Sequence, residues 1–247
     1  IRPTYTFPSL IDNSPLKRER IEGTDLVFLR ELTGGIYFGE KGRTDNGNVA
    51  FDHCVYSRDE VKRLAKKGFE LAMTRRKKLC CVDKANVLET SRLWRETVQQ
   101  MAKEYPEVEV SYEFVDAVAM RLVQWPNSYD VLITENLFGD ILTDEASVIS
   151  GSMGLMPSAS VGEKTSLYEP IHGSYPQAAG KDIANPLATV LSAAMMFEDA
   201  FGLVEEAEAI RKVVNKSLDL GIVTEDLSNK GKPYKTSEVG NWLAANI

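Results

Sequence analysis

Short apolar runs rich in β-forming residues alternate with amphipathic helical patterns along residues 25–134, and this alternation limits the possible folds most strongly. The runs that we predict as strands are DLVFLR (25–30), KLCCVD (78–83), VEVSYEF (108–114) and YDVLIT (129–134). A helical pattern lies between each run and the next. This order indicates α/β layers rather than a helix bundle or a β-sandwich.

The helical patterns carry recognisable start and stop signals. Segment 57–78 opens with Ser57 and Glu60 in the register of a capping box. The next helix is predicted to start at a Thr90 cap and to end before Pro106. In segment 115–126 an apolar stripe is expected to face the core, made of Val115, Val118, Ala119, Leu122 and Val123.

Segment 34–56 is rich in glycine and differs from the rest of the chain. Asn46-Gly47 is a hairpin turn signal, and the flanking IYF (36–38) and VAF (49–51) are short and apolar. The segment is predicted to be a protruding two-stranded arm that pairs with another subunit. An ordinary surface hairpin is the alternative.

The composition of the chain changes after Gly151. Segment 151–166 consists of small residues and is interpreted as a loop-rich domain crossing. Asn185 followed by Pro186 then signals the start of a helix. This helix is apolar almost all round and is expected to be buried, with Met195 and Met196 as core residues. Two further helices are predicted at 204–219 and 237–245.

Composition excludes several classes of function. The net charge of −7 is spread along the chain, which argues against nucleic acid or an anionic membrane surface as a partner. No apolar run approaches the roughly 20 residues that span a bilayer. The 3 cysteines lack metal-ligand spacing and suggest reduced thiols in the cytoplasm, and 2 histidines make a histidine-built zinc site improbable. The opening IRPTYTFPSL lacks an initiator Met, so we expect a C-terminal piece of a longer protein.

Asp140 and Asp144 are the first candidates for chemistry. In a helix they share one face at i and i+4, where two carboxylates repel each other. They are either part of a solvated helix face or half of a divalent-metal site. No G-x-G-x-x-G or Walker-type phosphate loop is present elsewhere in the sequence.

The other candidates are polar residues beside predicted strands. Arg2 and Arg30 are strand-borne cations that could bind carboxylates, and Lys84 follows a strand end, where α/β sheets place ligands. Tyr37 lies in the glycine-rich segment, and Asp116 heads a helix. Singly, Arg30 could form a surface ion pair, Tyr37 could be a packed aromatic, and Asp116 could be an acid favoured by the helix dipole. Together they supply the carboxylate clamp, the proton-transfer groups and the metal ligands of one reaction.

Several motifs, taken together, resemble the β-decarboxylating hydroxyacid dehydrogenases, the family of isocitrate and isopropylmalate dehydrogenases. They are RELTGGIYFGE (30–40), VDKANVLE (82–89), VDAVAMRLV (115–123), ENLFGDILTDEAS (135–147), GLMPSAS (154–160) and EPIHGSYPQAAGKDIANP (169–186). The TGGIYFG form is typical of the isopropylmalate type. The resemblance implies a two-domain α/β fold of mixed sheets flanked by helices, with a protruding β-arm. Residues 1–150 would bind substrate and dimerise, and 151–247 would be half of the dinucleotide-binding domain.

The resemblance also implies a role for each candidate. Asp140 and Asp144 would bind Mg²⁺ or Mn²⁺ together with Asp116 from the second subunit of a homodimer. Lys84, also donated across the dimer, would be the general base and Tyr37 the acid that protonates the enol. The residues expected to contact the substrate, a small hydroxy acid, are Arg2, Arg30 and Asp116. Those expected to contact NAD are His172, Gly173, Ser174, Gln177 and Asn185.

The implied reaction is NAD-dependent oxidative decarboxylation of 3-isopropylmalate to 4-methyl-2-oxopentanoate in leucine biosynthesis. Because the family usually begins about one hundred residues earlier, the printed chain alone is expected to be inactive. The family usually has Asp where this chain has Gln177, so its preference for NAD over NADP is expected to be weaker. Alternatives are a tartrate, isocitrate or homoisocitrate dehydrogenase, a non-catalytic subunit of the superfamily, or a metal phosphohydrolase.

Overall fold

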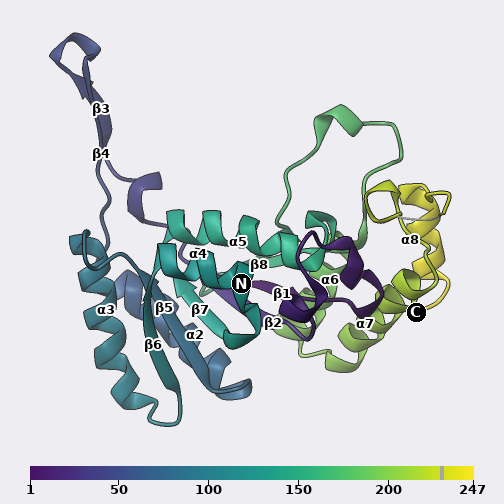
Figure 1. The fold of residues 1–247 in the computed structure, drawn as a ribbon, viewed down its shortest axis with the longest axis horizontal. Helices are drawn as coiled ribbons and strands as arrows, with labels where there is room; N and C mark the ends of the chain where they lie inside the picture. The colour runs from purple at the N-terminus through teal and green to yellow at the C-terminus, as the bar shows by residue number, and fades with distance from the viewer. Residues whose placement is uncertain (229–230) are drawn as a thin grey trace. The chain divides into compact units, whose positions relative to one another are not determined.

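A computed structural model of the chain describes residues 1–228 and 231–247, which form two compact units (Figure 1). We call residues Asp25–Glu145 the sheet unit, and Ile1–Thr24 with Ala146–Ile247 the terminal unit. Helix α5 (Asn136–Ser150) crosses the division after Glu145. The first 24 residues, predicted to belong with the segment that follows them, cluster instead with the C-terminal part.

The sheet unit is built on parallel strands. β2 (Asp25–Arg30), β7 (Val131–Thr134), β5 (Lys78–Asp83) and β6 (Glu109–Phe114) lie side by side in that order. Each neighbouring pair is parallel, so the carboxyl ends of all these strands meet at one edge. The predicted strands and the α/β class are confirmed.

Helices α2 (Arg58–Thr74), α3 (Glu89–Met101) and α4 (Val115–Gln124) connect these strands. The capping box is confirmed, since the Ser57 amide donates to the Glu60 carboxylate over 2.7 Å and the Glu60 amide donates to the Ser57 hydroxyl over 3.3 Å. The predicted Thr90 cap is wrong. The Leu88 amide already donates to the Lys84 carbonyl, so the chain has turned before Thr90 and α3 begins at Glu89.

The apolar stripe of α4 is narrower than predicted. Val118 and Leu122 are buried, whereas Val115 and Ala119 are only half-buried and Val123 is 43% exposed. The helix packs on β5 and β6 along one narrow face, so the residues beside Val118 and Leu122 lie outside the core of the unit.

The glycine-rich segment forms the predicted hairpin. β3 (Lys41–Thr44) and β4 (Val49–Asp52) pair antiparallel and extend away from the rest of the sheet unit (Figure 1). Asn46 and Gly47 take positive φ angles of 51° and 92° in the turn, as a tight hairpin requires. The IYF stretch is not a strand but lies in the short helix Gly35–Tyr37 and at its end. Pairing with another subunit stays a prediction.

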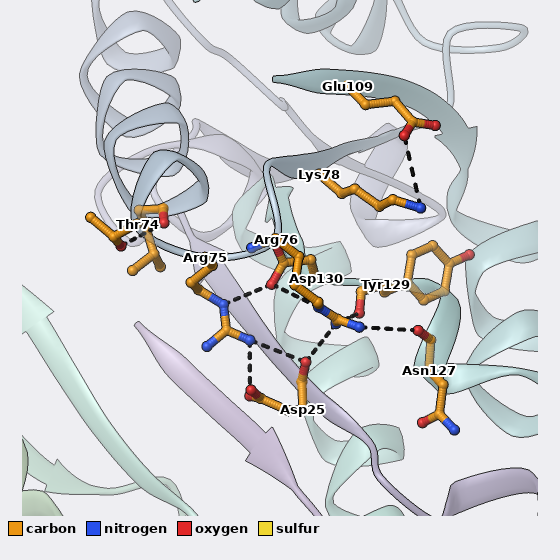
Figure 2. A network of polar contacts seen from close by, with 10 residues as sticks. Asp25, Thr74, Arg75, Arg76, Lys78, Glu109, Asn127, Tyr129 and Asp130 are labelled. Carbon is orange, nitrogen blue, oxygen red and sulfur yellow. Dashed lines mark hydrogen bonds and ion pairs between the residues drawn. The ribbon is translucent and has the colours of Figure 1, made fainter. Parts of the chain in front are cut away.

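A polar network closes the sheet unit at the amino ends of its strands (Figure 2). Asp130, immediately before β7, is completely buried and accepts from Arg75 Nε over 2.7 Å and from the Arg76 amide over 2.8 Å. Arg75 also bonds the Asp25 carboxylate over 2.8 Å, and Arg76 bonds the Tyr129 carbonyl. The end of α2 is thereby tied to the starts of β2 and β7.

The terminal unit combines strands with C-terminal helices. Its longer elements are β1 (Arg2–Tyr5), α1 (Arg18–Ile21), β8 (Pro157–Val161), β9 (Ser166–Pro170), α6 (Leu187–Phe201), α7 (Val204–Asp219) and α8 (Thr236–Ala244). The loop-rich interpretation of 151–166 was wrong, because β8 pairs antiparallel with β9. The predicted helices at 204–219 and 237–245 are confirmed.

The core of the terminal unit explains why residues 1–24 belong to it. The Ala159 amide donates to the Ile1 carbonyl over 2.9 Å, and the Ser14 hydroxyl donates to the Val148 carbonyl over 2.8 Å. Phe7 and Leu10 are buried in one apolar cluster with residues of the C-terminal part: Leu155, Leu187, Leu191, Val213, Val214, Leu218, Val223, Leu227, Val239 and Leu243. Burial of this apolar surface is the main force that holds the segments together.

Helix α6 begins one residue later than predicted, with Pro186 as its N-cap. Asn185 still satisfies the helix start, because its side-chain oxygen accepts from the Leu187 amide over 3.0 Å. Met195 is buried as expected, and Met196 is half-buried. Across the residues that the structure describes, every helix is too short or too polar to cross a lipid bilayer.

Candidate active site

The candidate residues of the sheet unit gather where its parallel strands end. Arg30 is the last residue of β2, Lys84 directly follows β5, and Asp116 lies in the first turn of α4 after β6. Helix α5, which carries Asp140, follows β7. Because all these strands point the same way, the side chains lie along one edge of the sheet, where open α/β sheets bind ligands.

Arg30, Tyr37 and Asp140 form one hydrogen-bonded cluster. Arg30 Nη1 lies 2.5 Å from Asp140 Oδ1, and the Tyr37 hydroxyl donates to Asp140 Oδ2 over 2.6 Å. The guanidinium lies over the Tyr37 ring, 5.5 Å from its centre. The Arg30 side chain is only 9% exposed whereas that of Asp140 is 41% exposed, so the cluster has a buried cation and an accessible carboxylate.

The hydroxyl of Tyr37 is held by Asp140 in this structure. The hydrogen bond raises the pKa of the Tyr37 phenol above its ordinary value, so the phenol is protonated at neutral pH, as an unshifted tyrosine would also be. Because the hydroxyl donates to Asp140, this hydrogen bond must be released before Tyr37 can give its proton to a bound molecule. The acid role that the sequence suggested for Tyr37 stays a prediction.

Lys84 and Asp116 form a second cluster. Lys84 Nζ lies 2.5 Å from Asp116 Oδ1 and 5.5 Å from the centre of the Phe114 ring. The Lys84 amide donates to the Ser91 hydroxyl over 2.9 Å, which fixes the backbone just beyond β5. The hydrogen bond from Lys84 lowers the pKa of Asp116, so this carboxylate stays ionised.

The aspartates suit a divalent metal only in part within one chain. Asp140 and Asp144 stand one turn apart on α5, and the two oxygens of Asp140 accept from Arg30 and from Tyr37 respectively. A carboxylate oxygen has further lone-pair capacity, so both oxygens can still ligate a hard cation. In residues 1–228 and 231–247, no group of at least 3 His, Cys, Asp or Glu side chains is placed to hold a metal. Within one chain Asp140 and Asp144 would be the carboxylate ligands, and water or substrate oxygens can complete the coordination of a hard cation.

The predicted cofactor residues lie in the terminal unit. His172, Gly173, Ser174 and Gln177 belong to the segment after β9, where Tyr175 takes a left-handed φ of 44°. Asn185 precedes α6, and its amide nitrogen donates to Asp226 over 2.9 Å. Arg2 also lies in this unit, on β1. The loop is accessible from Gly173 to Gln177, as a nucleotide-binding segment must be.

Sequence reasoning missed the residues that support the Arg30 cluster. Asn136, Tyr56 and Glu31 are buried polar side chains beside it. The Asn136 amide donates to the Tyr56 hydroxyl over 2.9 Å, and the Glu31 carboxylate accepts from the Gly34 amide over 2.8 Å. Only the position of Asn136, at the junction of a strand and a helix, could have drawn attention to it.

Comparisons with known proteins all lead to one family. The family model described as isocitrate/isopropylmalate dehydrogenase matches residues 1–243. The chain is 54% identical to a 3-isopropylmalate dehydrogenase of Desulfitobacterium hafniense, over 100% of this chain and 70% of that protein. It is 56% identical to one of Bacteroides fragilis, over 100% and 69%. The solved structure of isocitrate dehydrogenase from Methylococcus capsulatus aligns with a TM-score of 0.90 and 35% identity, over 99% of this chain and 71% of that one.

Proposed function

The chain belongs to the isocitrate/isopropylmalate dehydrogenase family, and we propose that its reaction is the NAD-dependent oxidative decarboxylation of 3-isopropylmalate to 4-methyl-2-oxopentanoate. This is a step of leucine biosynthesis. The observation that carries the proposal is the cluster in which Arg30 and Tyr37 both contact Asp140. It joins a carboxylate-binding cation, a proton donor and an expected metal ligand at one edge of the sheet.

Each residue then has a chemical task. Arg30 and Arg2 bind carboxylates of the substrate. Lys84 takes the hydroxyl proton while a hydride leaves the carbon that bears this hydroxyl, and Tyr37 protonates the enol that remains after loss of CO₂. NAD, when bound, accepts the hydride, and the residues expected to hold it are His172, Gly173, Ser174, Gln177 and Asn185.

Asp140 and Asp144 would hold Mg²⁺ or Mn²⁺, which supplies positive charge at the reacting oxygens. We propose that Asp116 and Lys84 serve the site of a second subunit, so that a homodimer shares two active sites. The pairing of Lys84 with Asp116 in a cluster separate from that of Arg30, Tyr37 and Asp140 supports this arrangement. Of the two segments predicted from the sequence, residues 1–150 would bind substrate and dimerise and residues 151–247 would bind the dinucleotide, with the difference that residues 1–24 pack in the terminal unit. The enzyme would act in the cytoplasm.

The proposal is tested with the natural protein that carries this sequence. We expect NADH to form with 3-isopropylmalate, NAD and Mn²⁺, and to stop forming when EDTA removes the metal, because two carboxylates without a cation cannot stabilise the developing charge. Isocitrate and tartrate are the control substrates. Faster turnover of either would identify a sister dehydrogenase, and no turnover of any substrate would favour a non-catalytic subunit.

Gln177 should weaken the selection of NAD over NADP. Replacing it by Asp adds a charge that repels the 2′-phosphate of NADP, and we expect the ratio of kcat/KM for NAD to that for NADP to rise about tenfold. Gln177→Asn is the matched control, because it shortens the side chain equally without adding charge. If both variants leave the ratio unchanged, Gln177 does not contact the ribose.

A further inference from the structure

We propose that Asn136 is a positioning residue that fixes Arg30 for bidentate binding of a substrate carboxylate and ties it to the turn that carries Tyr37. The inference rests on the proposed function. Asn136 is 2% exposed, so it acts through its neighbours rather than by touching the substrate.

The contacts of Asn136 decide which N–H groups of Arg30 remain available. Arg30 Nε donates to the Asn136 carbonyl over 2.9 Å, and Nη2 donates to the Asn136 side-chain oxygen over 2.7 Å. Nη1 donates to Asp140 over 2.5 Å. Nε has a single N–H and each Nη has a pair, so one N–H remains on each terminal nitrogen. A guanidinium offers a carboxylate two pairs of parallel N–H groups, and Asn136 occupies the side pair on Nε and Nη2, which leaves the end pair on Nη1 and Nη2 for bidentate binding beside Asp140.

The other end of the Asn136 amide contacts the glycine turn. Its nitrogen donates to the Gly34 carbonyl over 3.3 Å, and the Asn136 backbone amide donates to the Tyr56 hydroxyl over 2.9 Å. The turn is pressed against Tyr56, since a Cβ at Gly35 would lie 2.2 Å from that hydroxyl. Gly35 also has a φ of +73°, which disfavours any side chain. Tyr37 follows two residues later, so Asn136 connects both groups that contact Asp140.

The aliphatic part of the Arg30 side chain is also constrained by its neighbours. It crosses α5 at Gly139, where a Cβ would lie 2.6 Å from Arg30 Cγ and 2.3 Å from Thr134 Oγ1. The first turn of α5 therefore constrains Arg30 at two points. Its aliphatic part packs closely against the backbone at Gly139, and its guanidinium is bonded to the amide of Asn136. An arginine fixed in this way loses little rotamer entropy when it binds a ligand.

The test compares variants of the natural protein in steady-state assays. We expect Asn136→Ala to raise the KM for isopropylmalate about tenfold, as loss of one hydrogen bond to a charged group would, with the KM for NAD unchanged. In an Arg30→Lys background the same substitution should add little, because lysine has no Nε or Nη2 to be held. Asn136→Asp keeps an acceptor for Arg30 and loses the donor to Gly34. Its KM should be nearer to that of the unmodified protein than the KM of Asn136→Ala is. Its kcat should be lower, because the turn that leads to Tyr37 is no longer bonded to residue 136.

A purely structural role would lower the thermal stability of Asn136→Ala and leave its KM unchanged, which would overturn the inference. An equal effect in the Arg30→Lys background, or the same KM in the Ala and Asp variants, would also overturn it. Should Asn136→Ala not fold, Asn136→Asp decides, because it keeps the acceptor for Arg30 and loses only the donor to Gly34: a KM raised as much as in Arg30→Lys would overturn the inference. If the unmodified protein does not turn over isopropylmalate, the proposed function fails instead.

Discussion

Replacing Lys84 by methionine should lower kcat by a factor of about 10² to 10⁴, the contribution typical of a positioned proton-transfer group. Methionine keeps an unbranched apolar stem beside the Phe114 ring, which Lys84 Nζ overlies at 5.5 Å. What is lost is the amine that we propose takes the proton. The measurement is kcat with saturating isopropylmalate, NAD and Mn²⁺.

Lys84→Arg separates proton transfer from charge. Arginine keeps the positive charge beside Asp116 but does not release its proton in the pH range of proteins, so this variant should be as slow as Lys84→Met. Lys78→Met is the matched control, since Lys78 begins the same strand and is paired with Glu109 at 3.8 Å on the surface. It should leave kcat unchanged. Recovery of activity in Lys84→Arg would mean that Lys84 acts only as a cation.

Replacing Asp130 by alanine should reduce the free energy of unfolding by about 3–5 kcal/mol, the cost of breaking a buried ion pair by removing one partner. Arg75 and the Arg76 amide both point at this carboxylate, which is completely buried (Figure 2). Without it, donors near the strand starts lose their acceptor. Urea unfolding at a fixed protein concentration measures the change, because the stability of the proposed dimer would depend on concentration.

Asp25→Asn is the control for Asp130, because it removes another carboxylate that contacts Arg75 over 2.8 Å. The Asp25 side chain is 61% exposed, so its pair should contribute no more than about 1 kcal/mol. If Asp25→Asn and Asp130→Ala lowered the free energy of unfolding equally, burial would not distinguish the two ion pairs. The inference that the buried Asp130 stabilises the sheet unit would then be wrong.

Local patterns in the sequence predicted local structure well. The strands β2, β5, β6 and β7 and the Ser57 capping box follow from periodicity and short-range hydrogen bonds. Thr90 and Val123 were misjudged because their environments depend on the loop after β5 and on how narrowly α4 packs. The β8–β9 hairpin was missed because small residues in its strands resemble a loop.

The candidate site was predicted as a set of residues but not as a set of contacts. Arg30 and Asp140 are far apart in the sequence, and their ion pair depends on the parallel pairing of β2 with β7. Asn136 carries no chemical signature of its own, and its importance comes from facing Arg30 and Gly34 at once. The family itself, recognised from its motifs, is confirmed by the comparisons.

The discontinuous terminal unit also sets an order of events during synthesis. The ribosome makes residues 1–24 before the sheet unit, but their partners from Ala146 onward emerge only after it. Phe7 and Leu10 therefore cannot pack in this apolar cluster until after the contiguous segment 25–145 has become available to fold. Completion of the terminal unit then closes a long loop late, so the nascent chain passes through a stage in which one unit can be native and the other cannot.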